Sequence, residues 1–177
     1  MTATADQLSA GLDHIRAAPT DQGTLELIVR RPVVNEREIL EEGLLTAEHG
    51  LVGDMWSWRG TRPNPRAQVT VMNARSTALV AGDDRKRWAL AGDQLYVDLD
   101  VGPANLPPGT RLAIGDAVLE VSDLPHLGCA KFTARFGQEA RDFVNSEEGV
   151  SLNLRGINTQ VVQPGTVRVG DTVRKLQ

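Results

Sequence analysis

The chain has 177 residues, of which 41% are hydrophobic, so it is long enough for one domain with a substantial core. Its formal net charge of −4 argues against broad nucleic-acid binding, because such proteins carry an excess of positive charge. No run of about 18 apolar residues is present, so the sequence contains no candidate membrane-spanning helix and predicts no membrane partner.

The compartment is predicted from the first residues and from the cysteine content. The N-terminus lacks the basic start and the apolar run of a secretory signal. The chain has one cysteine, which cannot form an internal disulfide. Both features favour a reducing, cytoplasmic compartment.

Residues 1–22 are predicted to form a helical extension that precedes the main domain, residues 23–177. Thr4 and Gln7 have the spacing of a capping box, which marks a helix start. Apolar residues then recur on one helical face. They are Leu8, Leu12 and Ile15.

Most of the remaining chain is predicted to be short strands separated by turns that contain glycine or proline. The predicted strands cover residues 24–30, 44–47, 68–72, 94–101, 110–114, 117–121, 160–163, 166–169 and 172–176. Asn73 is expected to cap a helix over residues 74–81, and Gly82 is expected to close it. Residues 32–42 are polar and are predicted to be a loop.

This pattern predicts a β-rich α+β protein. The expected architecture is a closed or nearly closed β-barrel with a few peripheral helices, because closure removes unpaired sheet edges. A dinucleotide-binding sheet is disfavoured, since no GxGxxG motif follows a predicted strand.

The most informative segment is residues 124–132, which contains the only cysteine. Pro125 and Gly128 predict a turn before Cys129, and helical spacing of apolar residues starts at Ala130. Cys129 is therefore expected at a helix N-terminus, where N–H groups and the helix dipole favour a thiolate. An inert buried thiol, a single metal ligand, and a nucleophile or sulfur carrier remain open, and the context favours the last two.

Two neighbours of the cysteine are candidate catalytic residues. His126 and Lys131 are close in sequence and are expected to add positive charge beside the Cys129 thiol. His126 is also a candidate proton relay, because imidazole titrates near neutral pH. The His-x-x-Cys spacing offers too few ligands for a structural zinc site.

A set of ordered motifs carries a resemblance to a known family. They are Arg30-Arg31-Pro32, the turn over residues 50–54, the Gly115-Asp116 hairpin, and residues 117–121 leading into Pro125-His126-Leu127-Gly128-Cys129. Over about residues 23–176 the chain resembles the MOSC domain, the C-terminal domain type of molybdenum-cofactor sulfurases, as a small stand-alone bacterial-type member.

The resemblance implies a β-barrel-like fold with Cys129 at the active site. It further implies a sulfur carrier or sulfurtransferase. A separate pyridoxal-phosphate-dependent cysteine desulfurase would load sulfur as a persulfide on Cys129, for delivery to a metal–sulfur cofactor or another acceptor protein.

Two other functions stay open. In the first, the protein binds molybdenum cofactor as a reductase component or carrier, and Cys129 ligates the metal. The cofactor's pterin phosphate would then need cationic partners in a cleft near Cys129, and Arg31, Arg66 and Arg155 are the expected ones. In the second, the domain keeps the fold for protein interactions and has no chemistry of its own.

Overall fold

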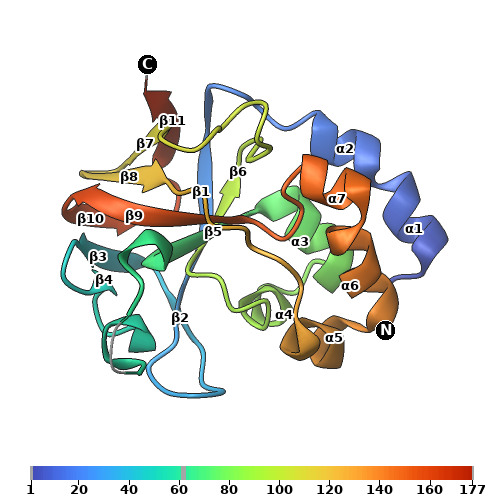
Figure 1. The fold of residues 1–177 in the computed structure, drawn as a ribbon, viewed down its shortest axis with the longest axis horizontal. Coiled ribbons are helices and arrows are strands. Elements are labelled where there is room, and N and C mark those ends of the chain that lie inside the picture. Colours follow the sequence, from blue (N-terminus) through green and yellow to red (C-terminus); the bar gives the residue numbers. More distant parts are fainter. Residues whose placement is uncertain (1, 61–62, 177) are drawn as a thin grey trace.

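Seven strands pair in a closed ring at the centre of the structure (Figure 1). The structure is a computed structural model that describes residues 2–60 and 63–176. These strands are β1 (Gln22–Arg30), β5 (Val69–Asn73), β6 (Leu95–Asp98), β7 (Arg111–Ile114), β8 (Ala117–Val121), β9 (Ile157–Gln163) and β11 (Thr172–Leu176). Their order around the ring is β11-β7-β8-β9-β5-β6-β1, and β11 pairs back with β1. Only β5 and β6 are parallel neighbours in this ring of described strands. The predicted β-barrel is confirmed.

A smaller sheet and an edge strand complete the β structure. β10 (Gly165–Arg168), β3 (Glu42–Thr46) and β4 (Gly50–Leu51) form the smaller sheet. β2 (Glu38–Leu40) pairs with β1 on the outside of the ring. The prediction of a loop over residues 32–42 is therefore wrong for β2. Its side chains are largely exposed, so this short edge strand lacks the apolar alternation that reveals a half-buried strand.

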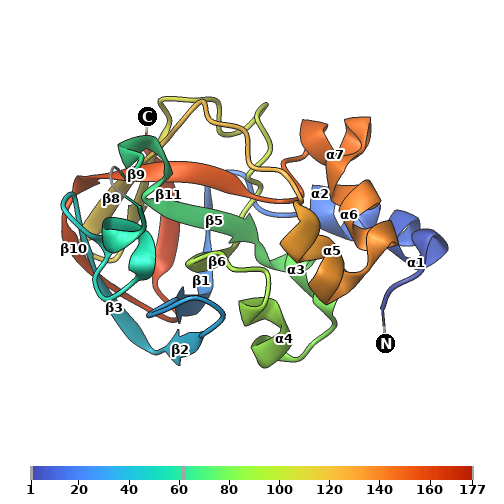
Figure 2. The same cartoon turned by 60° about the horizontal axis from the view of Figure 1, so that its bottom comes forward.

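The helices gather at one end of the barrel (Figures 1 and 2). They are α1 (Ala5–Ala10), α2 (Leu12–Arg16), α3 (Ala74–Ala81), α4 (Arg85–Ala89), α5 (Ala130–Phe136), α6 (Gln138–Asn145) and α7 (Glu147–Ser151). Two single-turn 3-10 helices, η1 (Met55–Trp58) and η2 (Pro65–Ala67), lie in the connection between β4 and β5. No helix in the described part of the chain is both long and apolar enough to cross a membrane.

Local signals set several helix ends. The Asn73 side chain accepts hydrogen bonds from the N–H groups of Arg75 and Ser76, as expected of the cap of α3. The helix expected after Cys129 begins at Ala130 but is interrupted at Gly137, which separates α5 from α6. Gly137 has a φ of 92°, which suits glycine, so the four-residue spacing of apolar side chains continues across two helices instead of one.

The core has two parts that share the same strands. Leu25 and Ile28 of β1 belong to the apolar cluster that contains the inward-facing residues of the ring, while Leu27 and Val29 belong to the cluster of the helices. Leu8, from the predicted N-terminal extension, is fully buried in this second cluster. Residues of the extension thus share a core with α3, α5 and α6.

We predict that Leu8→Ala lowers the free energy of unfolding by about 2–5 kcal/mol, because it removes a fully buried side chain and leaves a cavity. Urea unfolding followed by circular dichroism measures this loss. Ser9→Ala, at the next and exposed position, is the control and should change the stability by less than about 0.5 kcal/mol. Equal midpoints for the two variants would show that the N-terminal helices contribute little to the fold.

Candidate functional site

Cys129 is the N-cap residue of α5, and its thiol is exposed. A pair of hydrogen bonds to α6 fixes the loop in front of it. The Gly128 N–H donates to Asn145 Oδ1 at 2.7 Å, and Asn145 Nδ2 donates to the Gly128 carbonyl at 2.9 Å. The exposure of Cys129 excludes the interpretation as an inert buried thiol.

The surroundings of Cys129 favour the thiolate. Partial burial opposes ionisation, but the backbone N–H groups of Phe132 and Lys131 and the positive charge of Arg155 outweigh it, so the pKa of Cys129 is lowered. The free N–H groups of a helix start therefore act as the sequence predicts. Lys131 contributes through its backbone N–H, while the positive charge that lowers this pKa comes from Arg155.

A pocket of about 450 Å³ opens beside Cys129. It is lined by six cationic side chains, together with His126 and several apolar and polar residues. The six are Arg31, Arg37, Arg59, Lys131, Arg135 and Arg155. No aspartate or glutamate lines this pocket among the described residues. The pocket thus combines one ionisable thiol with a strongly positive wall.

Arg31 is held in place by a buried carboxylate. Its Nε and Nη2 donate to the two oxygens of Asp54 at 2.9 and 2.7 Å, and its Nη1 donates to the Gly92 carbonyl at 3.0 Å. Asp54 is fully buried and also caps η1 by accepting from the Trp56 N–H. Although burial lowers the pKa of Arg31, the hydrogen bonds and charge of Asp54 raise it above its ordinary value. Arg31 is a permanent, oriented cation.

Arg155, which also lines the pocket, is fixed in a similar way. Its Nη1 donates to Asp93 Oδ2 at 2.6 Å, and its Nη2 donates to the Ala91 carbonyl at 3.0 Å. The guanidinium carbon lies 5.0 Å from the ring centroid of Phe132 on α5. Arg155 therefore connects the chain before β9 with the helix that starts at Cys129.

His126 is neutral at neutral pH. Burial and the nearby charge of Arg155 lower the pKa of its imidazole to about 4, and the opposing effect of Asp93 is smaller. The expectation that His126 adds positive charge next to Cys129 is therefore wrong. The physical reason is that the ring is buried and lies near the charges of Arg155 and Arg31, which makes a further positive charge there unfavourable.

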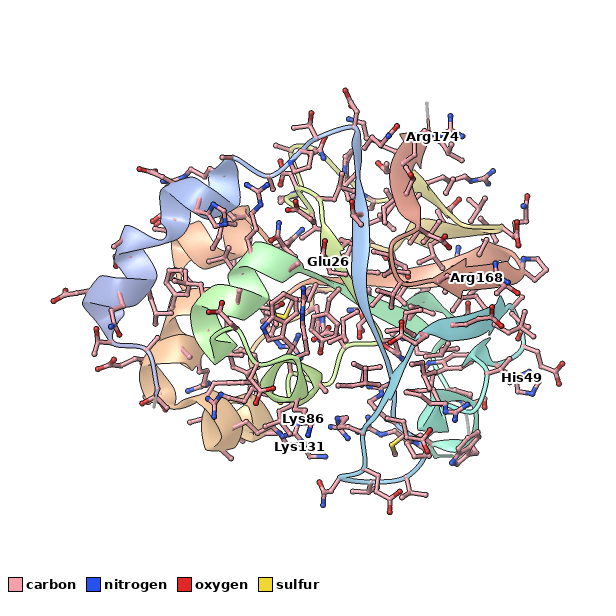
Figure 3. The ribbon with its side chains drawn as sticks, turned by 180° about the vertical axis from the view of Figure 1, so that it is seen from behind. Glu26, His49, Lys86, Lys131, Arg168 and Arg174 are labelled. Carbon is pink, nitrogen blue, oxygen red and sulfur yellow. The ribbon has the colours of Figure 1, made fainter. Side chains whose placement is uncertain are left out.

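Five of the six residues predicted for the site line the same pocket: Cys129, His126, Lys131, Arg31 and Arg155. Arg66 does not. It forms an ion pair with Asp123 and is absent from the pocket wall. Figure 3 shows Lys131 beside the helices.

The residues predicted for the site did not include Arg37, Arg59, Arg135 or Asp93. Arg135 had a usable signal, because it follows Lys131 by four residues and such residues share a face of α5. Arg37 had none. Burial lowers its pKa, and repulsion from Arg135 and Arg31 lowers it further, which shows how closely the positive charges are gathered.

The MOSC domain family model matches residues 59–174, more than half of the chain. The chain belongs to the MOSC domain family. Its fold is similar to that of the YuaD protein from Bacillus subtilis, with 18% identity and a TM-score of 0.59 over 88% of this chain and 97% of that one. YiiM from Escherichia coli has 19% identity and a TM-score of 0.58 over 87% and 70% of the two chains. Comparison with the curated proteins gives no significant match.

We predict that native Cys129 reacts with iodoacetamide at a lower pH than a free cysteine, whose pKa is about 8.5. The reason is that α5 and Arg155 favour the thiolate of this MOSC domain. The alkylation rate, measured by intact mass against pH, gives the apparent pKa. Arg155→Met should raise that pKa, and reaction only after unfolding would contradict the prediction.

We predict a loss of stability on acidification that depends on His126. Its pKa is lower in the folded chain than the ordinary 6.5, so the unfolded chain binds the extra proton between about pH 6.5 and 4. The contribution of neutral His126 is present above this window and falls as the pH drops through it, by on the order of 3 kcal/mol. Urea unfolding at several pH values measures it.

His126→Gln is the control for this acid effect, because glutamine does not titrate. The stability difference between the wild type and the variant should shrink from pH 7 to pH 4. A difference that stays constant would show that His126 titrates normally.

Proposed function

We propose that this MOSC domain binds molybdenum cofactor in the Cys129 pocket, with the Cys129 thiolate as the protein ligand of the metal. MOSC domains are associated with molybdenum cofactor systems. The observation that carries the proposal is the combination in one pocket of an ionisable thiol and six cationic side chains, with no carboxylate among the described residues that line it. A soft metal and an anionic phosphate on one small molecule match that combination.

The charges of the pocket support an anionic ligand. Among the residues described, Arg37, Arg59, Lys131 and Arg135 form no ion pair. The buried Nε of Arg155 also has no hydrogen-bond partner. An anion in the pocket would relieve the repulsion between these groups and offer acceptors to their N–H donors.

The donor set also suits a cofactor that brings metal ligands of its own. Within the described part of the chain, no group of three or more histidine, cysteine, aspartate and glutamate side chains converges. Cys129 would add one thiolate to the sulfur ligands of the pterin. When bound, the cofactor would supply redox chemistry at its metal.

The chain's own residues have separable tasks in this proposal. Arg31 and Arg155 are held by buried carboxylates, so they can orient a phosphate without moving. The other four cations that line the pocket, here called the outer cations, attract the anionic ligand and repel competing cations. They are Arg37, Arg59, Lys131 and Arg135. The lowered pKa of Cys129 reduces the cost of losing the thiol proton before it ligates a metal.

A sulfur carrier is the second candidate, and the exposure of the Cys129 thiol favours it. The thiolate would attack the outer sulfur of a persulfide on a cysteine desulfurase, forming the Cys129 persulfide and releasing the donor thiolate. A partner acceptor would then take that sulfur. We place this function second because it needs an exposed thiolate but has no use for a large cationic pocket.

The test is anaerobic purification followed by molybdenum, pterin and intact-mass analysis. Molybdenum and pterin in equal amounts, lost in Cys129→Ser, support cofactor binding. A mass increase of one sulfur atom without molybdenum supports the carrier. Ordinary thiol reactivity with neither species overturns both and leaves a non-catalytic interaction domain.

We predict that Arg59→Glu lowers the cofactor content of the purified protein, with an affinity loss of roughly tenfold to a hundredfold. A charge-assisted hydrogen bond contributes about 1.5–3 kcal/mol, which sets this range. Arg66→Glu is the matched control, since Arg66 is also a half-exposed arginine but pairs with Asp123 outside the pocket. Molybdenum and pterin phosphate per protein are the measurements. A loss of molybdenum and pterin in Arg66→Glu but not in Arg59→Glu would contradict the assignment of Arg59 to the cofactor site.

A further inference from the structure

Two buried polar atoms face each other behind the pocket, and neither has another partner. His126 Nδ1 lies 3.5 Å from Asp93 Oδ1. Both atoms are buried and make no hydrogen bond in the described structure, whereas Asp93 Oδ2 accepts from Arg155. Buried polar atoms without partners are costly, so this pair of atoms calls for a physical explanation.

A proton on Nδ1 provides one. His126 is neutral near pH 7, so its ring carries a single proton, on either Nδ1 or Nε2. A proton on Nε2 would leave the lone pair of Nδ1 facing the carboxylate oxygen of Asp93, which is repulsive. A proton on Nδ1 removes this repulsion and places a donor 3.5 Å from that oxygen, and such contacts are often long until a ligand is bound.

The other edge of the ring faces the cavities. Although Nδ1 is buried, 18% of the His126 side chain is exposed. His126 lines both the Cys129 pocket and a neighbouring cavity of about 340 Å³, and the two cavities also share Arg31, Arg59 and Thr70. The exposed edge, which carries Nε2, therefore lies where the two cavities join.

We propose that Asp93 is a positioning residue that holds His126 as the Nδ1–H tautomer, so that Nε2 accepts a hydrogen bond from a hydroxyl or N–H group of the bound ligand. The six cationic side chains of the pocket can only donate hydrogen bonds, and they recognise any anion. His126 adds selectivity for an anion that carries a donor. This selectivity rests on the proposed function, because it requires that the pocket binds anions.

The first experiment reads the tautomer directly in the full chain labelled with ¹⁵N-histidine. The chain has three histidines, and His126→Gln identifies the signal of His126. Long-range ¹H–¹⁵N spectra near neutral pH should show a protonated Nδ1 and a bare Nε2. A bare Nδ1 would overturn the proposal without the need for any Asp93 variant.

A matched pair of variants separates Asp93 from its ion pair. In Asp93→Asn the amide N–H group can donate to Nδ1, so the proton should move to Nε2. Arg155→Met breaks the same ion pair but leaves the carboxylate. Because it also removes a charge that lowers the pKa of His126, its spectra are recorded at a pH high enough to keep the ring neutral, where the Nδ1–H tautomer should remain. The same tautomer in the wild type and in folded Asp93→Asn would also overturn the proposal.

The second experiment compares inorganic phosphate with sulfate at about pH 8, where both are mainly dianions but only phosphate carries a hydroxyl donor. Calorimetric titration of the wild type should favour phosphate by about threefold to tenfold, the usual effect of one net hydrogen bond. The preference should vanish or reverse in Asp93→Asn. Equal affinities in the wild type would overturn the selectivity. If neither anion binds, the proposed function fails, and the tautomer alone decides the role of Asp93.

Discussion

The Arg155–Asp93 ion pair is the contact on which the site depends. Its two groups are buried, the Nη1–Oδ2 distance is 2.6 Å, and the guanidinium also lies over Phe132 of α5, so one cation connects the barrel with the helix of Cys129. Removing either partner would leave an uncompensated buried charge, which costs about 3–5 kcal/mol.

The backbone beside Arg155 passes through Gly156, whose φ is 101° and where a Cβ would lie 2.5 Å from the Val71 carbonyl oxygen. Glycine is therefore required next to Arg155 by both conformation and space.

A protein with a net negative charge maintains a positive pocket because its carboxylates are placed selectively. Asp54 and Asp93 lie behind the pocket and neutralise the two inner arginines, Arg31 and Arg155. The four outer cations have no such partners among the described residues, and no described carboxylate lines the wall. The apolar surroundings strengthen the electric field of these outer charges. The pocket therefore attracts anions even though the protein as a whole is acidic. The net charge of −4 gives no information about the sign of the charge in this pocket.

The sequence predicted those features whose decisive contacts lie within a few residues. The Asn73 cap, the Gly115-Asp116 hairpin and the helix start after Cys129 are examples, because turn and capping hydrogen bonds are local. The features that it did not predict depend on distant partners. Arg66 was expected in the cleft near Cys129, but it pairs instead with Asp123, which is far away in the sequence. Asp93 lies in a short connection before β6, and only tertiary structure brings it against Arg155 and His126.

The countercharge of the thiolate is an arginine and not the nearby histidine. Arg155 favours the charged form of Cys129 and disfavours the charged form of His126, so it lowers the pKa of both groups. In a cysteine–histidine pair the thiolate would lose its countercharge when the imidazole loses its proton near neutral pH. Arginine keeps its charge over the whole accessible range, so the thiolate here is stabilised independently of that titration. The same arrangement leaves His126 neutral, and a neutral ring can accept a hydrogen bond in a pocket whose six cationic side chains can only donate.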